Sequence, residues 1–486
     1  MMKKMNYMVT IAIVVVLMAS SCKKFLEQSP DDRTTLNSAE KVQQLLVSAY
    51  PKASYITFCE AMSDNVADKN ITHIEPINRN PYFFEDSNSQ DIDSPNAYWD
   101  ACYAAIAAAN QALQVISSVS DSVRYKAQKG EALVARAYAH FMLVTLFAKV
   151  YNPTTANADP GIPYVTEPEK VVFKKYKRKT VAFVYGHIEK DLTHGLPLIA
   201  NSIYQVPKYH FTIAAAHAFA SRFYLFKKDY TRVVEHANAA ISAGSMASYL
   251  RPINSSAYQS LQYYDRQAQY TAATTNANLL LAGAASLWGR SYASYRYGYT
   301  FVIHKQTIGA PNVTGGTWAF GLYGNEISLN VPKFHEHFVK TSINAHDGDP
   351  YNMIPLLSTE ELLFNRAEAN VYLGNNEDAL RDLNDYASTR IANYKHANHT
   401  ITASSVMKFY HTTMLKEGLI RTVLDFKRNE FLFEGQRWFD MLRYNLAVVH
   451  QSADGSKMVA IGPTDPRRVL QLPLEVTLSG LDRNPR

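Results

Sequence analysis

The sequence predicts a mainly α-helical fold, in which helical hairpins carry a loop-rich region with a minor amount of β-structure. Apolar residues recur at every third and fourth position over most of the 486-residue chain, which is the spacing of amphipathic helices. This spacing fades between residues 245 and 350, where Gly, Asn, Thr and aromatic residues accumulate. We therefore expect helical parts at residues 38–244 and 351–486, with a loop-rich subdomain at residues 245–350 between them.

The first residues of the chain have the pattern of an export signal. Lys3 and Lys4 precede an apolar run from Ile11 to Met18, which is followed by the small residues Ala19-Ser20-Ser21. The apolar run is too short to span a bilayer. We expect residues 1–21 to be removed as a signal peptide.

Cys22 follows this signal directly, and the junction resembles a bacterial lipobox, in which the cysteine thiol becomes lipidated. Ala19 stands where leucine is usual, and an ordinary signal peptide that ends at a cysteine is the alternative. Several acyl chains, each buried at ~0.8 kcal/mol per CH₂, make a lasting anchor. Residues 22–37 then form a lipidated N-terminus and polar tether.

The charge of the chain bears on its partners, and its cysteine content bears on disulfide formation. The net charge of +6 is spread without long basic runs, so a nucleic-acid partner is not expected. Besides Cys22 the chain contains only Cys59 and Cys102. In an exported protein these two residues form a disulfide if their positions allow it, or remain buried free thiols, and the sequence leaves both alternatives open.

Helical spacing locates the elements along the chain. It predicts helices at residues 38–50, 98–116, 131–150, 181–196, 212–226 and 230–242, a helical hairpin at 361–390 and a helical stretch at 420–446. The segment 361–390 repeats the hairpin of residues 212–242: a shift of 146 residues aligns Ala379 with Val233, although Gly374 then faces Lys228. This repeat resembles a degenerate tetratricopeptide unit, in which small residues let two helices approach closely.

A specific family resemblance appears near the C-terminus, in the run RNEFLFEGQRWFDMLRY at residues 428–444. It resembles the signature of the SusD/RagB family of outer-membrane lipoproteins, and further similar segments follow in family order. These are GEALVARAYAHFMLVTLFAKVY (130–151), GIPYVTEP (161–168), ELLFNRAEANVYLGNNEDAL (361–380) and LQLPLEVTLSGLDRNP (470–485).

The resemblance implies a surface-exposed, lipid-anchored outer-membrane protein with tetratricopeptide-like hairpins and a loop-rich ligand-binding subdomain. Family members pair with a SusC-like TonB-dependent transporter and help it to capture glycans or, in some branches, peptides. They are not enzymes. The resemblance therefore implies capture of an oligosaccharide for a partner transporter, with a peptide receptor or an envelope scaffold as the alternatives.

The residues of the signature suggest a structural role. In a helix, Glu434 and Arg437 lie three positions apart, so we expect an ion pair between them, with Trp438 and Phe439 packed inward. A buried ion pair beside a tryptophan is more often part of the fold than of a binding site.

Candidate ligand-binding residues concentrate in the loop-rich subdomain. A sugar presents apolar C–H faces and hydroxyl edges, which suits exposed aromatic rings flanked by polar groups. The candidates are Trp288, Tyr292, Tyr295, Tyr297, Trp318 and Tyr323, with Tyr82 in a second aromatic loop. Alternation at residues 295, 297 and 299 places three rings on one face if this segment is a strand. The alternative is that these rings pack the loops together.

Catalytic, metal and cofactor sites are not expected. His335-Glu336-His337 and the His346–Asp349 segment lack the spacing of a helical zinc motif or a calcium loop. The chain contains no phosphate-binding glycine loop followed by Lys-Ser/Thr and no Gly-x-Ser-x-Gly motif. A glycoside hydrolase remains the enzymatic alternative, with no acid/base pair to name.

Overall fold

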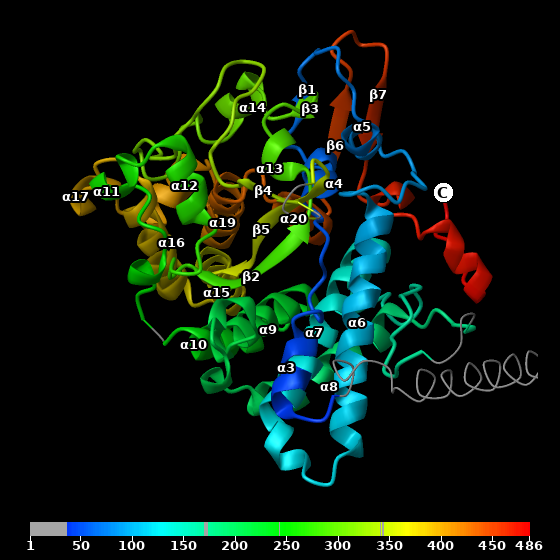
Figure 1. Cartoon of the computed structure of the whole chain (residues 1–486). Helices are drawn as coiled ribbons and strands as arrows, with labels where there is room; N and C mark the ends of the chain where they lie inside the picture. The colour runs from blue at the N-terminus through cyan, green and yellow to red at the C-terminus, as the bar shows by residue number, and fades with distance from the viewer. Residues whose placement is uncertain (1–35, 170–173, 243, 341, 343–344) are drawn as a thin grey trace, which may run out of the picture. The chain divides into compact units, whose positions relative to one another are not determined.

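The computed structural model describes residues 36–169, 174–242, 244–340, 342 and 345–486 (Figure 1). The predicted signal peptide and Cys22 lie outside these residues. The first described helix is α3 (Ala39–Leu46), and residues 45–486 form one compact unit. Among the described helices, none combines the length and apolarity that a membrane span requires.

The helices of the N-terminal half form packed hairpins. They are α4 (Ile56–Met62), α5 (Pro76–Tyr82), α6 (Pro95–Ser118), α7 (Lys126–Phe147) and α8 (Val181–Gly195). Helix α7 packs between α6 and α8 (Figure 1). The Ser94 hydroxyl accepts a hydrogen bond from the backbone N–H of Ala97 at 3.0 Å and so caps α6. The predicted helices at 98–116, 131–150 and 181–196 are confirmed.

The predicted repeat is present as two helical hairpins. The first consists of α9 (Ile213–Lys227) and α10 (Tyr230–Ala240), and the second of α15 (Thr359–Leu373) and α16 (Asn376–Arg390). Helix α10 packs on α15 and thereby joins the two hairpins. Ala237 and Ala379 are fully buried, as close helix packing requires. The mainly α fold with paired helices is confirmed.

The strands of the described residues form small antiparallel sheets. The largest has the order β2-β5-β4 and consists of β2 (Asn278–Ala285), β5 (Gly348–Ser358) and β4 (Glu336–Lys340). The others pair β1 (Ala67–Asp68) with β3 (Tyr297–Gly298), and β6 (Val448–Gln451) with β7 (Met458–Ile461). Because β2 pairs with β5, strand pairing continues across residue 350, the predicted end of the loop-rich subdomain.

Short helices complete the loop-rich segment and the connections. The α-helices are α11 (Ser256–Gln259), α12 (Tyr263–Tyr270), α13 (Trp288–Ser291), α14 (Phe301–Gln306), α17 (His396–His399) and α18 (Ala403–Phe409). The 3₁₀-helices are η2 (Ser122–Tyr125), η3 (Leu196–Leu198), η4 (Asn201–Ile203), η5 (Pro207–Tyr209), η6 (Ala247–Tyr249), η7 (Pro466–Arg468) and η8 (Leu474–Ser479).

The C-terminal signature spans a break between two helices, α19 (Leu415–Glu430) and α20 (Gln436–Arg443), where a helical stretch was predicted. Phe433 and Gly435 both have a φ of 70°, in the left-handed region, and this ends the helical path. The Glu60 carboxylate of α4 accepts hydrogen bonds from the backbone N–H groups of Phe433 and Gly435, both at 3.0 Å. Glu60, in the N-terminal part of the chain, therefore stabilises the break between the two helices.

The predicted ion pair between Glu434 and Arg437 is wrong. Glu434 precedes α20, so the two side chains do not share a helix face, and Arg437 instead forms a bidentate pair with Asp64, with both N···O distances at 2.8 Å. Trp438 and Phe439 are buried, as predicted. The signature therefore connects the C-terminal helices to the segment that follows α4.

Candidate functional site

The structure buries most of the aromatic residues that the sequence suggested as ligand contacts. Their exposed fractions lie between 1% and 6%, whereas a ring platform needs an open face. The buried residues are Tyr82, Trp288, Tyr292, Tyr295, Tyr297 and Trp318. Tyr323 alone of the suggested set is half-buried. These rings pack the loop-rich region, which is the alternative that the sequence left open.

Specific contacts explain this burial. The Trp288 indole N–H donates to the Phe433 carbonyl at 3.0 Å, so it fixes α13 to the signature. Tyr82 stacks between Tyr297 and His450, with ring centroids 4.3 and 4.1 Å away. Trp318 packs edge-on against Phe426 at 5.1 Å. Strand β3 covers only residues 297 and 298, so the predicted alternation of three tyrosines does not form a strand face.

Tyr323 belongs to a more exposed group of rings that we call the tyrosine ledge: Tyr263, Tyr264, Tyr323 and His335. The ring centroid of Tyr263 lies 5.3 Å from that of Tyr264 and 5.2 Å from that of Tyr323, both in edge-on geometry. The His335 ring lies 5.9 Å from Tyr264. Tyr264 is 70% exposed, so the ledge offers ring surface to solvent.

Hydrogen bonds hold the rings of the ledge in place. The Tyr263 hydroxyl donates to the Asn330 side-chain oxygen at 3.0 Å and lies 3.2 Å from the hydroxyl of buried Tyr292. Tyr323 and Asn330 exchange two backbone hydrogen bonds, of 2.8 and 2.9 Å, which close the loop between them. The ledge is therefore ordered by neighbours that lie beneath it.

Arg266 supports the Tyr323 ring from α12. Its guanidinium lies 5.6 Å from the Tyr323 ring centroid and donates to the carbonyls of Leu261 and Gln259 at 3.0 and 2.7 Å. A Cβ at Gly321 would lie 2.4 Å from an Arg266 nitrogen, so only glycine lets this side chain lie there.

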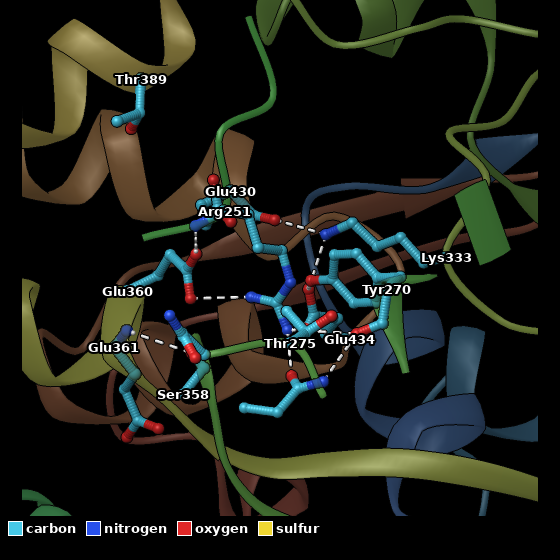
Figure 2. Close-up of polar contacts among 12 residues, drawn as sticks. Arg251, Tyr270, Thr275, Lys333, Ser358, Glu360, Glu361, Thr389, Glu430 and Glu434 are labelled. Carbon is cyan, nitrogen blue, oxygen red and sulfur yellow. Dashed lines mark hydrogen bonds and ion pairs between the residues drawn. The ribbon is translucent and has the colours of Figure 1, made fainter. Parts of the chain in front are cut away.

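A buried network of charges lies at the base of the loop-rich segment, and Figure 2 shows part of it. Arg390 contacts Glu430 at 2.7 Å and Glu360 at 2.9 Å. Arg251 contacts the other Glu360 oxygen at 2.7 Å. Lys333 contacts Glu434 at 2.6 Å. Three cations therefore face three carboxylates, which meets the requirement that buried charges be paired.

This network anchors both segments that carry the ledge. Tyr270, at the end of α12, donates its hydroxyl hydrogen bond to Glu434. Its ring lies 4.1 Å from the Arg251 guanidinium and 5.1 Å from the Lys333 ammonium. Lys333 lies two residues before His335. The exposed rings therefore project from segments whose buried ends are fixed to α15, α16 and α19.

The electrostatics of the network favour its ionised form. Burial opposes ionisation of Glu430, but the charges of Arg390, Lys333 and Arg251 outweigh it and lower its pKa to about 2. Burial and the Glu434 carboxylate raise the pKa of Tyr270 well above its ordinary value, so this hydroxyl keeps its proton and donates. Glu430 therefore contributes a negative charge to the network, and Tyr270 contributes a hydrogen-bond donor.

Sequence reasoning missed Tyr263, Tyr264 and His335. A signal was present for the first two, because adjacent residues of a helix point about 100° apart. Two neighbouring tyrosines in the polar segment QYYDRQAQ cannot both face inward, so one ring had to be exposed. His335 offered no such signal, since its place beside Tyr264 depends on the pairing of β4 with β5.

The structure shows the state of the two cysteines and of the suspected metal motifs. Cys59 and Cys102 are buried free thiols in this structure. His335, which directly precedes β4, and His337 within β4 have ring centroids 5.3 Å apart. In the part of the chain that the structure describes, no group of three or more His, Cys, Asp or Glu side chains is placed to hold a metal ion.

Two family models match the sequence. Residues 24–225 match a SusD-like model described as "Starch-binding associating with outer membrane", and residues 338–468 match a model described as "SusD family". A search of curated proteins found no match.

Solved structures share the fold at low sequence identity. A SusD superfamily protein from Bacteroides thetaiotaomicron superposes with a TM-score of 0.66 at 19% identity, covering 92% of this chain and 100% of the other. A SusD-like carbohydrate binding protein from Bacteroides vulgatus gives 0.63 at 16%, with 91% and 96% covered. A laminarin binding SusD-like protein gives 0.60 at 16%, with 92% and 98% covered. The model matches at both ends of the chain, together with this shared fold, show that the protein belongs to the SusD/RagB family.

Proposed function

We propose that this protein is a cell-surface lipoprotein that binds an oligosaccharide at the tyrosine ledge and delivers it to a SusC-like, TonB-dependent outer-membrane transporter. It acts as a binding protein and not as an enzyme. The lipid on Cys22 keeps it at the outer membrane, and residues 22–37 serve as its tether. The observation that carries the proposal is an ordered set of rings, of which Tyr264 and His335 are exposed and Tyr263 and Tyr323 are half-buried.

The chemistry of the ledge suits a sugar. Aromatic faces stack against the C–H face of a pyranose, and polar groups beside them select among hydroxyl patterns. Glu336 follows His335 in the chain and forms a bidentate ion pair with the exposed side chain of Arg290. The exposed polar residues Gln262 and Asp265 flank Tyr263 and Tyr264 in the sequence. The matched family model and the laminarin-binding structural neighbour support a glucan as the ligand class.

Calorimetry with laminarihexaose and maltohexaose tests the proposal on the purified chain without its signal peptide. In the double variant Tyr264→Ala/Tyr323→Ala, binding at the ledge should be at least tenfold weaker, and Tyr249→Ala, which removes an exposed ring outside the ledge, should bind like the parent. An affinity and a stoichiometry that both equal those of the parent would reject the ledge as a site. Co-purification of the chain with a co-expressed transporter tests the delivery step.

A peptide ligand is the second candidate, and one observation favours it. Strand β4 is an outer strand of the sheet β2-β5-β4, and its Phe338 and Val339 are 45% and 53% exposed. An extended peptide adds to such a strand through backbone hydrogen bonds. Binding of extended peptides, lost when a proline replaces Val339, would support this candidate over a sugar.

A further inference from the structure

A second ring-lined hollow, of about 600 Å³, lies away from the ledge. It is formed by the loop after α7, the turn between α9 and α10, the end of α15, the end of α20 and residues 463–469. Four tyrosines line it: Tyr151, Tyr230, Tyr372 and Tyr444. We call it the four-tyrosine cleft. It shares no residue with the ledge.

The rings of this cleft are ordered but not buried. Tyr230 stacks on Tyr372, with ring centroids 4.2 Å apart and planes 3° from parallel. The Tyr444 hydroxyl donates to Glu368 at 2.8 Å, and the Tyr372 hydroxyl lies 3.5 Å from that of Tyr444. All four rings are half-buried, so they keep part of their surface toward the hollow. Fixed, partly open rings lose little conformational entropy when a ligand binds.

The charged groups that line the cleft, apart from exposed Lys228, already have partners. Arg443 forms a bidentate pair with Glu368, with both N···O distances at 2.7 Å, and Lys149 contacts Asp159 at 2.8 Å. Arg468 donates to the carbonyls of Leu446 and Met441 at 2.8 and 2.6 Å. A charged ligand would have to compete with these partners. The composition therefore favours a neutral ligand.

Hydrogen-bonding groups stand at the rim of the cleft. Asn152, Asn445 and Thr464 are exposed and line the hollow. They offer amide and hydroxyl groups that act both as donors and as acceptors, as sugar hydroxyls do. The lining residues come from helix ends and loops and none lies in a strand, so the hollow provides no strand edge for a peptide backbone.

We propose that the four-tyrosine cleft is a second carbohydrate-binding site, which holds one to three residues of a neutral oligosaccharide. This inference rests on the proposed function, that the protein binds carbohydrate. The ring pair Tyr230/Tyr372 and Tyr444 contact the sugar faces, and the rim amides contact its hydroxyls. The protein then has two sites of similar chemistry in different parts of the fold, one on the loop-rich region and one on the helical hairpins.

Calorimetry with maltohexaose and laminarihexaose separates the two sites. The parent chain should bind with a stoichiometry of two, and the ledge variant Tyr264→Ala/Tyr323→Ala should retain one site. Adding Tyr230→Ala to the ledge variant should weaken the remaining binding at least tenfold. Tyr230→Ala also removes packing, so Thr464→Trp provides a second test. Residue 464 is exposed at the rim, and a tryptophan there fills the cleft without altering the buried contacts. This variant should weaken the same binding by a similar factor.

The outcomes distinguish the two proposals. Binding of one ligand that the ledge variant abolishes would overturn the second site and leave the proposed function standing. Binding that the ledge variant leaves unchanged, but that Tyr230→Ala and Thr464→Trp both weaken, would support the cleft and overturn the ledge. Residual binding that neither cleft variant alters would overturn the second site. Absence of binding by the folded parent chain to either glucan would overturn both.

Discussion

Lys228 and Gly374, which lie 146 residues apart, occupy the same position in two helical hairpins. Each follows the first helix of its hairpin with a left-handed backbone, at φ of 65° and 83°. The next residue donates its N–H back into the helix in both cases, Asp229 to Tyr224 at 2.9 Å and Asn375 to Asn370 at 2.8 Å. The two hairpins therefore share the same type of turn, although the residue at this position differs between them.

Lys228→Gly should stabilise the protein by about 0.5–1 kcal/mol, because glycine adopts a left-handed backbone without the cost that a Cβ imposes. Gly374→Ala should destabilise it by about 1 kcal/mol. A Cβ at residue 374 meets no atom within 4 Å, so this cost is purely conformational. Urea unfolding followed by circular dichroism measures both changes.

Gly186→Ala is the matched control for these variants. Its Cβ would also stand in open space, but Gly186 lies inside α8 with an ordinary helical backbone. Alanine should therefore stabilise the protein there by up to about 1 kcal/mol. The same sign of effect at residues 186 and 374 would contradict the conformational explanation.

Gly321→Ala should weaken glucan binding threefold or more while changing stability little. The new methyl group displaces Arg266, which supports the Tyr323 ring of the ledge. Gly283→Ala in β2, where an added Cβ meets nothing within 4 Å, should bind like the parent. Calorimetry with laminarihexaose measures the affinity of both variants. An unchanged affinity of Gly321→Ala would show that the position of Arg266 does not affect ligand binding.

Trp288→Phe should destabilise the protein by about 1–3 kcal/mol, because it leaves the Phe433 carbonyl without its buried donor. Trp318→Phe should cost less, since the indole N–H of Trp318 has no hydrogen-bond partner. Both folded variants should bind glucans within twofold of the parent. Loss of binding without loss of stability would instead indicate that these tryptophans contact the ligand.

Glu430→Gln should destabilise the protein by about 3–5 kcal/mol, because it leaves the three buried cations of the network with only two carboxylates. The pKa of Glu430 is about 2 in the fold, below the ordinary value of about 4.3, so its contribution is complete above that ordinary value and is lost as the pH falls toward 2. Melting temperatures from pH 7 to pH 2.5 should fall more steeply for the parent than for the variant. Parallel curves would contradict the ionised state of Glu430.

Cys22→Ala should move the protein from the membrane fraction to the soluble fraction, because no lipid is then attached. The released protein should bind glucans with the affinity of the purified parent chain, since the rings of the ledge belong to residues 263–335. Detergent partitioning and calorimetry measure the two properties. Loss of binding by the released form would show that the anchor does more than hold the protein in place.

Much of the fold followed from periodicity, because buried helices leave their spacing in the sequence. The hairpins α6–α7, α9–α10 and α15–α16 lie within a few residues of their predicted positions. The predicted C-terminal helical stretch is divided into α19 and α20, because the left-handed backbone at Phe433 depends on distant Glu60. Partners of this kind lie far apart in the sequence and leave no local pattern.

The candidate site was less predictable for the same reason. A tyrosine or tryptophan serves equally well as a packed ring and as a sugar platform, and only tertiary contacts decide which. Tyr297 and Tyr323 occur in similar sequence surroundings, yet Tyr82 covers the first and the second borders solvent. The buried ion pairs of the network likewise join residues 30 to 109 positions apart.

The hydrogen bonds that Glu60 accepts from Phe433 and Gly435 can form only late in synthesis of the chain. An exported chain crosses the membrane with its N-terminus first, and the first of these partners follows Glu60 by 373 residues. At about 5–20 residues per second, synthesis of that interval takes roughly 20–75 s. During this time the buried carboxylate of Glu60 lacks the two backbone donors that it binds in the folded protein, although α4 can already pack on α5. A truncated chain that lacks the signature would leave this carboxylate without both donors.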